Sequence, residues 1–67
     1  MIKVGSHVAL NSDTAEMFPS LANRIHEVVD TRLCNGTYVL RMRAVTGAGL
    51  DDTIVEFETC DLHEVCQ

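Results

Sequence analysis

The fold of this chain depends on residues 21–33, which read LANRIHEVVDTRL. Apolar side chains recur there at the spacing of one helix face, at Leu21, Ile25, Val28, Val29 and Leu33. Ser20 precedes the stretch and Asn35-Gly36 follows it, both as candidate helix caps. The periodicity by itself therefore favours a helix.

Other features of the same stretch favour a strand. It is rich in β-branched residues, which pack well on a pleated sheet. Asn35-Gly36 is the strongest two-residue hairpin signal, because both central positions of a type I′ turn require positive φ. A strand with a bulge near Glu27-Val28 would also place Ile25 and Val28 on one face. The residues alone leave both interpretations open.

The rest of the second half predicts strands. Residues 37–45 alternate, with Tyr38, Leu40, Met42 and Ala44 on one face and Val39, Arg41, Arg43 and Val45 on the other. Residues 46–52 predict a turn, and residues 53–59 alternate again as the hairpin partner, with Glu56 and Glu58 facing Arg41 and Arg43. Residues 60–65 predict a tight turn and a short closing strand.

The first half predicts one strand and an apolar loop. Residues 2–10 are rich in apolar residues, and Gly5-Ser6 marks the place where the strand begins or kinks. Asp13 is expected to cap a short helical turn together with Glu16, and Pro19 ends it. The loop that follows carries Met17, Phe18 and Leu21, a more apolar set than a solvated loop usually shows.

This order of apolar segments resembles the SH3-like small barrels of the KOW and Tudor type. The matching segments are VGSHVAL (4–10), IHEV (25–28), GTYVLR (36–41), VEF (55–57) and DLHEV (61–65). The resemblance implies an all-β, five-stranded SH3-like barrel with a short helical turn in its first loop, formed by residues 1–67 as a single domain. Such barrels often carry Gly before the second strand, where this chain has Asn23-Arg24. An α+β sandwich of β-α-β-β order stays open as the alternative.

Composition limits the class of protein. The chain has 67 residues, a formal charge of -5 and an apolar content of 46%. A chain of this size supports one small core, so any active site would have to be shallow or shared between subunits. No stretch has the length and apolarity of a membrane span or a secretory signal, so we expect a cytoplasmic protein without membrane contact.

The candidate metal ligands are Cys34, Cys60, His63 and Cys66, which together would offer zinc three thiolates and one imidazole. The usual pair of Cys-x-x-Cys knuckles is absent, and an odd number of cysteines is typical of reduced thiols. No spacing places a base beside a nucleophile. We expect no cofactor and no catalytic residues.

The remaining signals concern partners. Met17, Phe18 and Leu21 either complete the core or form a contact surface for a protein partner or a second copy of the chain. Arg41 and Arg43 share a face that could touch phosphates or an acidic peptide, but only five basic residues disfavour nucleic-acid binding. We therefore expect a non-catalytic interaction or regulatory module. The alternatives are an acidic regulator that binds or mimics nucleic acid and, third, a small oligomeric enzyme.

Overall fold

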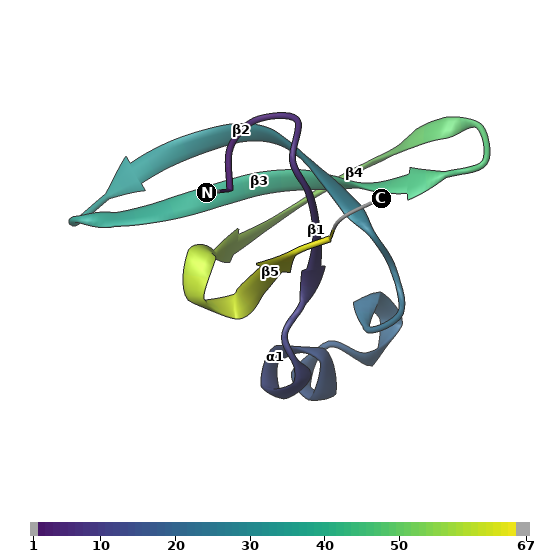
Figure 1. Cartoon of the computed structure of the whole chain (residues 1–67), viewed down its shortest axis with the longest axis horizontal. Helices are drawn as coiled ribbons and strands as arrows, with labels where there is room; N and C mark the ends of the chain where they lie inside the picture. Colours follow the sequence, from purple (N-terminus) through teal and green to yellow (C-terminus); the bar gives the residue numbers. More distant parts are fainter. Residues whose placement is uncertain (1, 66–67) are drawn as a thin grey trace.

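The protein is an all-β chain built on one bent antiparallel sheet, as its computed structural model shows for residues 2–65 (Figure 1). The sheet has five strands in the order β4-β3-β2-β1-β5, an arrangement compatible with a small barrel-like fold. The strands are β1 (His7–Leu10), β2 (His26–Cys34), β3 (Thr37–Thr46), β4 (Gly49–Glu58) and β5 (Leu62–Glu64). A short helix, α1 (Ser12–Met17), and a 3-10 turn, η1 (Pro19–Leu21), lie between β1 and β2. The all-β prediction is therefore confirmed.

The ambiguous stretch forms β2, and the helical alternative is wrong. β2 pairs with β3 from His26 to Cys34 and with β1 at His26 and Glu27, so its backbone forms ladder hydrogen bonds and not those of a helix. Its register with β3 shifts between Val28 and Asp30, close to the predicted bulge. The helix-like spacing does not describe a buried face, because Val28 is buried while Leu33 is exposed.

The Asn35-Gly36 prediction is confirmed. Asn35 has a φ of 51° and Gly36 a φ of 80°, which are the positive values that a type I′ turn requires. The turn sets the register of the long β2–β3 hairpin, which reaches beyond the rest of the sheet (Figure 1). β3 buries Leu40, Met42 and Ala44, as its alternation predicts. Tyr38 shares their face but stays exposed near the end of the hairpin.

Three local predictions need correction. The first strand begins at His7, because residues 2–6 turn back on themselves and the Ser6 amide donates to the Lys3 carbonyl oxygen at 2.9 Å. The predicted turn over residues 46–52 shrinks to two residues, since β4 already starts at Gly49; a register shift between Arg43 and Val45 accommodates the polar residues after it. Asn11, not Asp13, occupies the cap position of α1.

The closing elements join the two ends of the chain. A second 3-10 turn, η2 (Thr59–Asp61), leads into β5, which pairs with β1. The Asn11 Nδ2 donates to the Cys60 carbonyl oxygen at 2.9 Å, and Asn11 Oδ1, the atom that would cap α1, lies 2.9 Å from His63 Nδ1. The core lies inside the bent sheet and is formed by Val8, Leu10, Val28, Leu40, Met42 and Leu62.

Candidate functional site

Met17 and Phe18 protrude from the loop between β1 and β2. Met17 is 74% exposed and Phe18 42% exposed. The Phe18 amide donates to the Thr14 carbonyl oxygen at 3.1 Å, and its own carbonyl oxygen accepts from the Leu21 amide at 2.9 Å. These bonds tie the backbone of Phe18 to α1 and η1 while leaving much of its side chain in solvent.

The exposed ring rests on a second aromatic residue from the sheet. Phe18 and Phe57 meet edge to face, with ring centroids 5.3 Å apart and planes at 82°. This geometry is favourable for aromatic pairs. Phe57 lies on β4 and also packs against the core, so the contact joins the loop to the sheet.

The pair forms one wall of a surface groove, which we call the aromatic groove. Its volume is about 340 Å³. It is lined by Thr14, Met17, Phe18, Val39, Glu56, Phe57, Glu58 and Asp61. Apolar side chains from the loop, β3 and β4 therefore lie beside carboxylates from β4 and η2.

Leu21 does not belong to this groove. Its side chain packs against the core and lines a separate cavity of about 130 Å³ with Arg24, His26 and Asp51 among its neighbours. The structure thus separates Leu21, which helps to complete the core, from Met17 and Phe18 at the surface.

Arg41 and Arg43 also lie outside the groove lining, and both are held by acidic residues. Arg41 Nε lies 3.2 Å from Glu56 Oε1, across the register pair that joins β3 and β4. Arg43 pairs with Asp52 at 3.1 Å, not with Glu58, and its Nε donates to the Asp51 carbonyl oxygen at 2.6 Å. The antiparallel register explains this difference from the expected pairing, because it places Ile54 opposite Arg43 and Glu58 opposite Val39.

The carboxylates of η2 and the end of β4 have a different environment. Asp61 accepts hydrogen bonds from the Thr14 hydroxyl at 3.2 Å and from the Glu58 amide at 3.4 Å. Both donors are neutral. Within residues 2–65, neither Glu58 nor Asp61 forms an ion pair with Lys, Arg or His.

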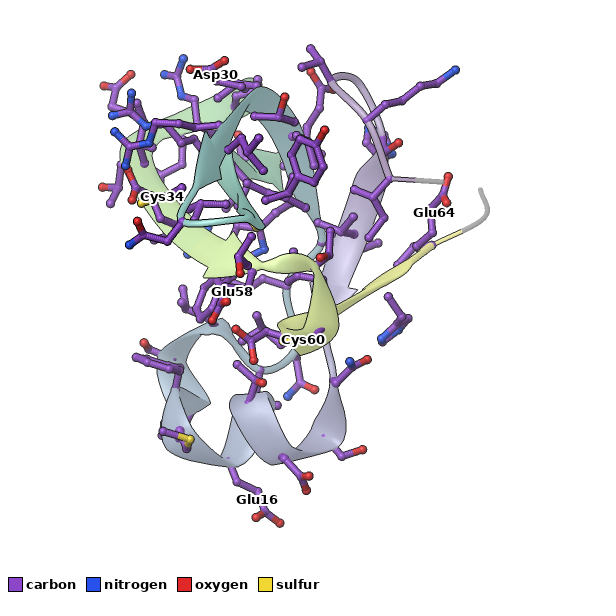
Figure 2. All side chains as sticks on the ribbon, turned by 90° about the vertical axis from the view of Figure 1, so that its left-hand side faces the viewer. Glu16, Asp30, Cys34, Glu58, Cys60 and Glu64 are labelled. Carbon is purple, nitrogen blue, oxygen red and sulfur yellow. The ribbon has the colours of Figure 1, made fainter. Side chains whose placement is uncertain are left out.

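The candidate zinc ligands do not come together in the part of the chain that the structure describes. Figure 2 shows Cys34 at the end of the β2–β3 hairpin, apart from Cys60 in η2. His63 Nδ1 lies 2.9 Å from Asn11 Oδ1, a hydrogen-bond distance. Cys66 lies outside the described residues. Cys60 is instead grouped with Glu58 and Asp61, whose ligand atoms lie within 4.8 Å of one another, and Asp61 already accepts two hydrogen bonds.

His26 is a buried titratable residue, and nothing in the sequence distinguished it from His7 and His63. It is 1% exposed, and its Nδ1 has no hydrogen-bond partner among residues 2–65. Burial lowers the pKa of His26, and the positive charge of Arg24 lowers it further, against an opposing hydrogen bond to the Arg24 backbone. The neutral imidazole is therefore favoured, which suits a place beside the core.

Fold and site together define a small all-β domain with an aromatic, acid-rimmed groove at its surface. Comparison with protein-family models, curated proteins and solved structures found no match. In residues 2–65 no helix has the length and apolarity needed to cross a membrane.

Proposed function

We propose that this chain is a non-catalytic protein-interaction module and that the aromatic groove is its contact surface. The observation that carries the proposal is the exposure of Met17 and Phe18, which keep large exposed surfaces although Phe18 packs against Phe57 of the sheet. Exposed aromatic and methionine side chains in a concave setting are typical anchors for a partner. A rigid aromatic pair also loses little conformational entropy on binding.

We further propose that the barrel is SH3-like, of the KOW and Tudor type. The strand order, the bulged second strand and the single 3-10 turn before the closing strand all support this assignment. SH3-like barrels bind peptides, nucleic acids or other proteins, so the fold alone does not select the partner. Here the selection depends on the groove and on the charges around it.

The distribution of charge supports a protein partner over a nucleic acid. Affinity for a phosphate backbone comes mainly from free Lys and Arg side chains. Four of the five basic residues already lie in ion pairs with carboxylates, namely Arg24, Arg32, Arg41 and Arg43. The exposed free thiols of Cys34 and Cys60 further support action in a reducing compartment such as the cytoplasm.

Substitution at the groove tests this proposal. We expect a variant with Met17→Ser and Phe18→Ser to keep the wild-type circular dichroism spectrum but to lose partner proteins in affinity capture from the native extract. Ile54→Ser is the matched control, because Ile54 is also exposed, at 46%, but does not line the groove. Light scattering on the same three proteins separates a different partner from a second copy of the chain.

Two results would contradict the proposal. One is capture of the same proteins, in the same amounts, by wild type and the double variant. The other is loss of the folded spectrum in the double variant with no loss in Ile54→Ser, which would mean that the loop residues serve the core.

A further inference from the structure

The rim of the aromatic groove carries negative charge that the chain itself does not neutralise. Glu56 is held between two guanidinium groups, at 3.2 Å from Arg41 and 3.5 Å from Arg32. Glu58 and Asp61, in contrast, have no cationic partner within residues 2–65. The groove therefore presents two uncompensated carboxylates beside its apolar wall.

The neighbouring helix adds to this charge. Asp13 and Glu16 lie on α1, are exposed, and are not engaged in an ion pair in the described part of the chain. Figure 2 shows Glu58 between the barrel and the helical loop, and Glu16 on the outer side of that loop. The arginines lie on β2, β3 and just before β2, where Glu56, Asp51 and Asp52 bind them. Charge is thus segregated, and the loop end of the molecule is acidic.

We propose that the aromatic groove binds a cationic polypeptide segment, in which one apolar side chain contacts the Phe18–Phe57 pair and flanking Lys or Arg side chains contact Glu58 and Asp61. This inference rests on the proposed function, because it names the partner of the same groove. The inference is based on charge complementarity between the acidic groove rim and a cationic segment. A cation at this rim meets two carboxylates with no competing internal cation, while a carboxylate or phosphate there is repelled.

The interaction is expected to be exposed and therefore modest in energy. Solvent-exposed ion pairs contribute little individually and are screened by salt. The apolar side chain supplies the larger part of the affinity, since it removes the exposed surface of Met17 and Phe18 from water. The carboxylates select the charge of the partner.

Titration with defined peptides tests this inference. The probes are blocked heptapeptides with a central Phe and three flanking residues on each side, all Lys in one peptide, all Ser in the second and all Glu in the third. A fourth peptide keeps the six lysines but carries Ala at the centre. Binding is followed by the amide resonances of the ¹⁵N-labelled full chain.

We expect the Lys–Phe peptide to shift the resonances of the groove residues, the Ser–Phe peptide to bind more weakly and the Glu–Phe peptide not to bind. The Ala-centred peptide should bind more weakly than its Phe counterpart. Raising the NaCl concentration from about 20 mM to about 300 mM should weaken the Lys–Phe peptide several-fold and leave the Ser–Phe peptide nearly unchanged.

A matched pair of variants locates the charge effect. Glu58→Gln should weaken the Lys–Phe peptide about threefold to fivefold, as expected for an exposed ion pair. Asp30→Asn removes the same charge from an exposed site on β2 that Figure 2 shows at the end of the molecule away from the helical loop, and it should leave the affinity within about twofold. Equal weakening by both variants would overturn the assignment to the rim.

The two levels of proposal fail differently. If the Ser–Phe and Glu–Phe peptides shift the groove as strongly as the Lys–Phe peptide, the groove is a contact surface without charge selection, and only this inference is overturned. If no peptide shifts the groove residues, the inference is overturned as well; loss of partner proteins in the Met17 and Phe18 capture experiment would then still support the proposed function.

Discussion

Two methionines show how position, more than residue type, decides the role of a side chain in this protein. Met42 lies on β3 with 0% of its surface exposed and is part of the core, whereas Met17 at the end of α1 is 74% exposed. Removing a buried side chain loses its transfer free energy and leaves a cavity, while removing an exposed one does neither.

We therefore expect Met42→Ala to lower the free energy of unfolding by about 2 to 5 kcal/mol, a large part of the stability of so small a domain. Met17→Ala should change it by less than about 0.5 kcal/mol. Urea denaturation followed by circular dichroism measures both. Comparable destabilisation by the two substitutions would mean that Met17 is buried in solution and would remove it from the contact surface.

His26 makes stability depend on pH. In the folded chain, burial and the positive charge of Arg24 lower the pKa of His26 below its ordinary value of 6.5. Well above pH 6.5 the imidazole is neutral in both the folded and the unfolded chain, so His26 does not oppose folding there. As the pH falls below 6.5, the unfolded chain binds a proton before the folded chain does, and stability is lost.

The urea midpoint should accordingly fall between pH 7 and pH 5.5, a range above the usual titration of carboxylates. His26→Leu should remove most of this fall. His63→Gln should keep it, because His63 is exposed in β5. A fall of unchanged size in His26→Leu would show that another group causes it.

At the scale of elements, the β2–β3 hairpin is the part of the fold most directly set by local chemistry. Gly36 adopts a φ of 80°, and an added Cβ would meet no atom within 4 Å. A side chain at position 36 would therefore lower stability only through the strain of the left-handed backbone conformation. Gly47, in the β3–β4 turn, has equally free space but no positive φ.

Gly36→Ala should therefore destabilise the protein by about 1 to 2 kcal/mol, as expected for a residue with Cβ in the left-handed region. Gly47→Ala should be close to neutral or slightly stabilising. Thermal denaturation of the two variants provides the comparison. If Gly47→Ala were the more damaging of the two, the β2–β3 turn would not have the conformation described above.

The elements differ in how far the sequence predicts them, and the reasons are physical. Asn35-Gly36 and the alternation in residues 37–45 are local signals, and both are confirmed. Asp13 was expected as the cap of α1, yet Asn11 occupies that position and directs its side chain to Cys60, 49 positions away. The turn at residues 46–52 was predicted too long, because Asp51 and Asp52 are typical turn residues, whereas in the structure they lie in β4 and contact Arg24 and Arg43 from distant positions.

The aromatic groove was also predictable only in part, because local sequence signals mark some of its residues and not others. The apolar composition of the loop was enough to predict Met17 and Phe18 as candidate contact residues. Phe57, Glu58 and Asp61 join them through contacts between distant parts of the chain, which neither periodicity nor spacing reports. Leu21 was expected at the same surface but packs against the core.

At the scale of the whole molecule, the net charge of -5 is unevenly distributed. The arginines are paired with carboxylates of β4, while Asp13 and Glu16 on α1 are exposed and make the loop end of the molecule acidic. Few free cations remain to displace counterions from a polyanion.

We accordingly expect no binding to single-stranded or double-stranded DNA or RNA at micromolar concentration, even in about 20 mM salt where electrostatic attraction is strongest. Fluorescence anisotropy with labelled oligonucleotides measures this. Micromolar binding would mean that Arg41 and Arg43 release their carboxylates to bind phosphates, and it would favour a nucleic-acid regulator.

The central claim, that the aromatic groove is where this protein meets its partner, is tested most directly by placing a photoreactive residue at its edge. Full-length chains with p-benzoylphenylalanine at the position of Met17 or, as control, at the position of Ile54 are irradiated in the native extract and separated by mass. A discrete adduct to a polypeptide from position 17 and none from position 54 is the predicted result. Adducts of equal yield from both positions, or from position 54 alone, would contradict it.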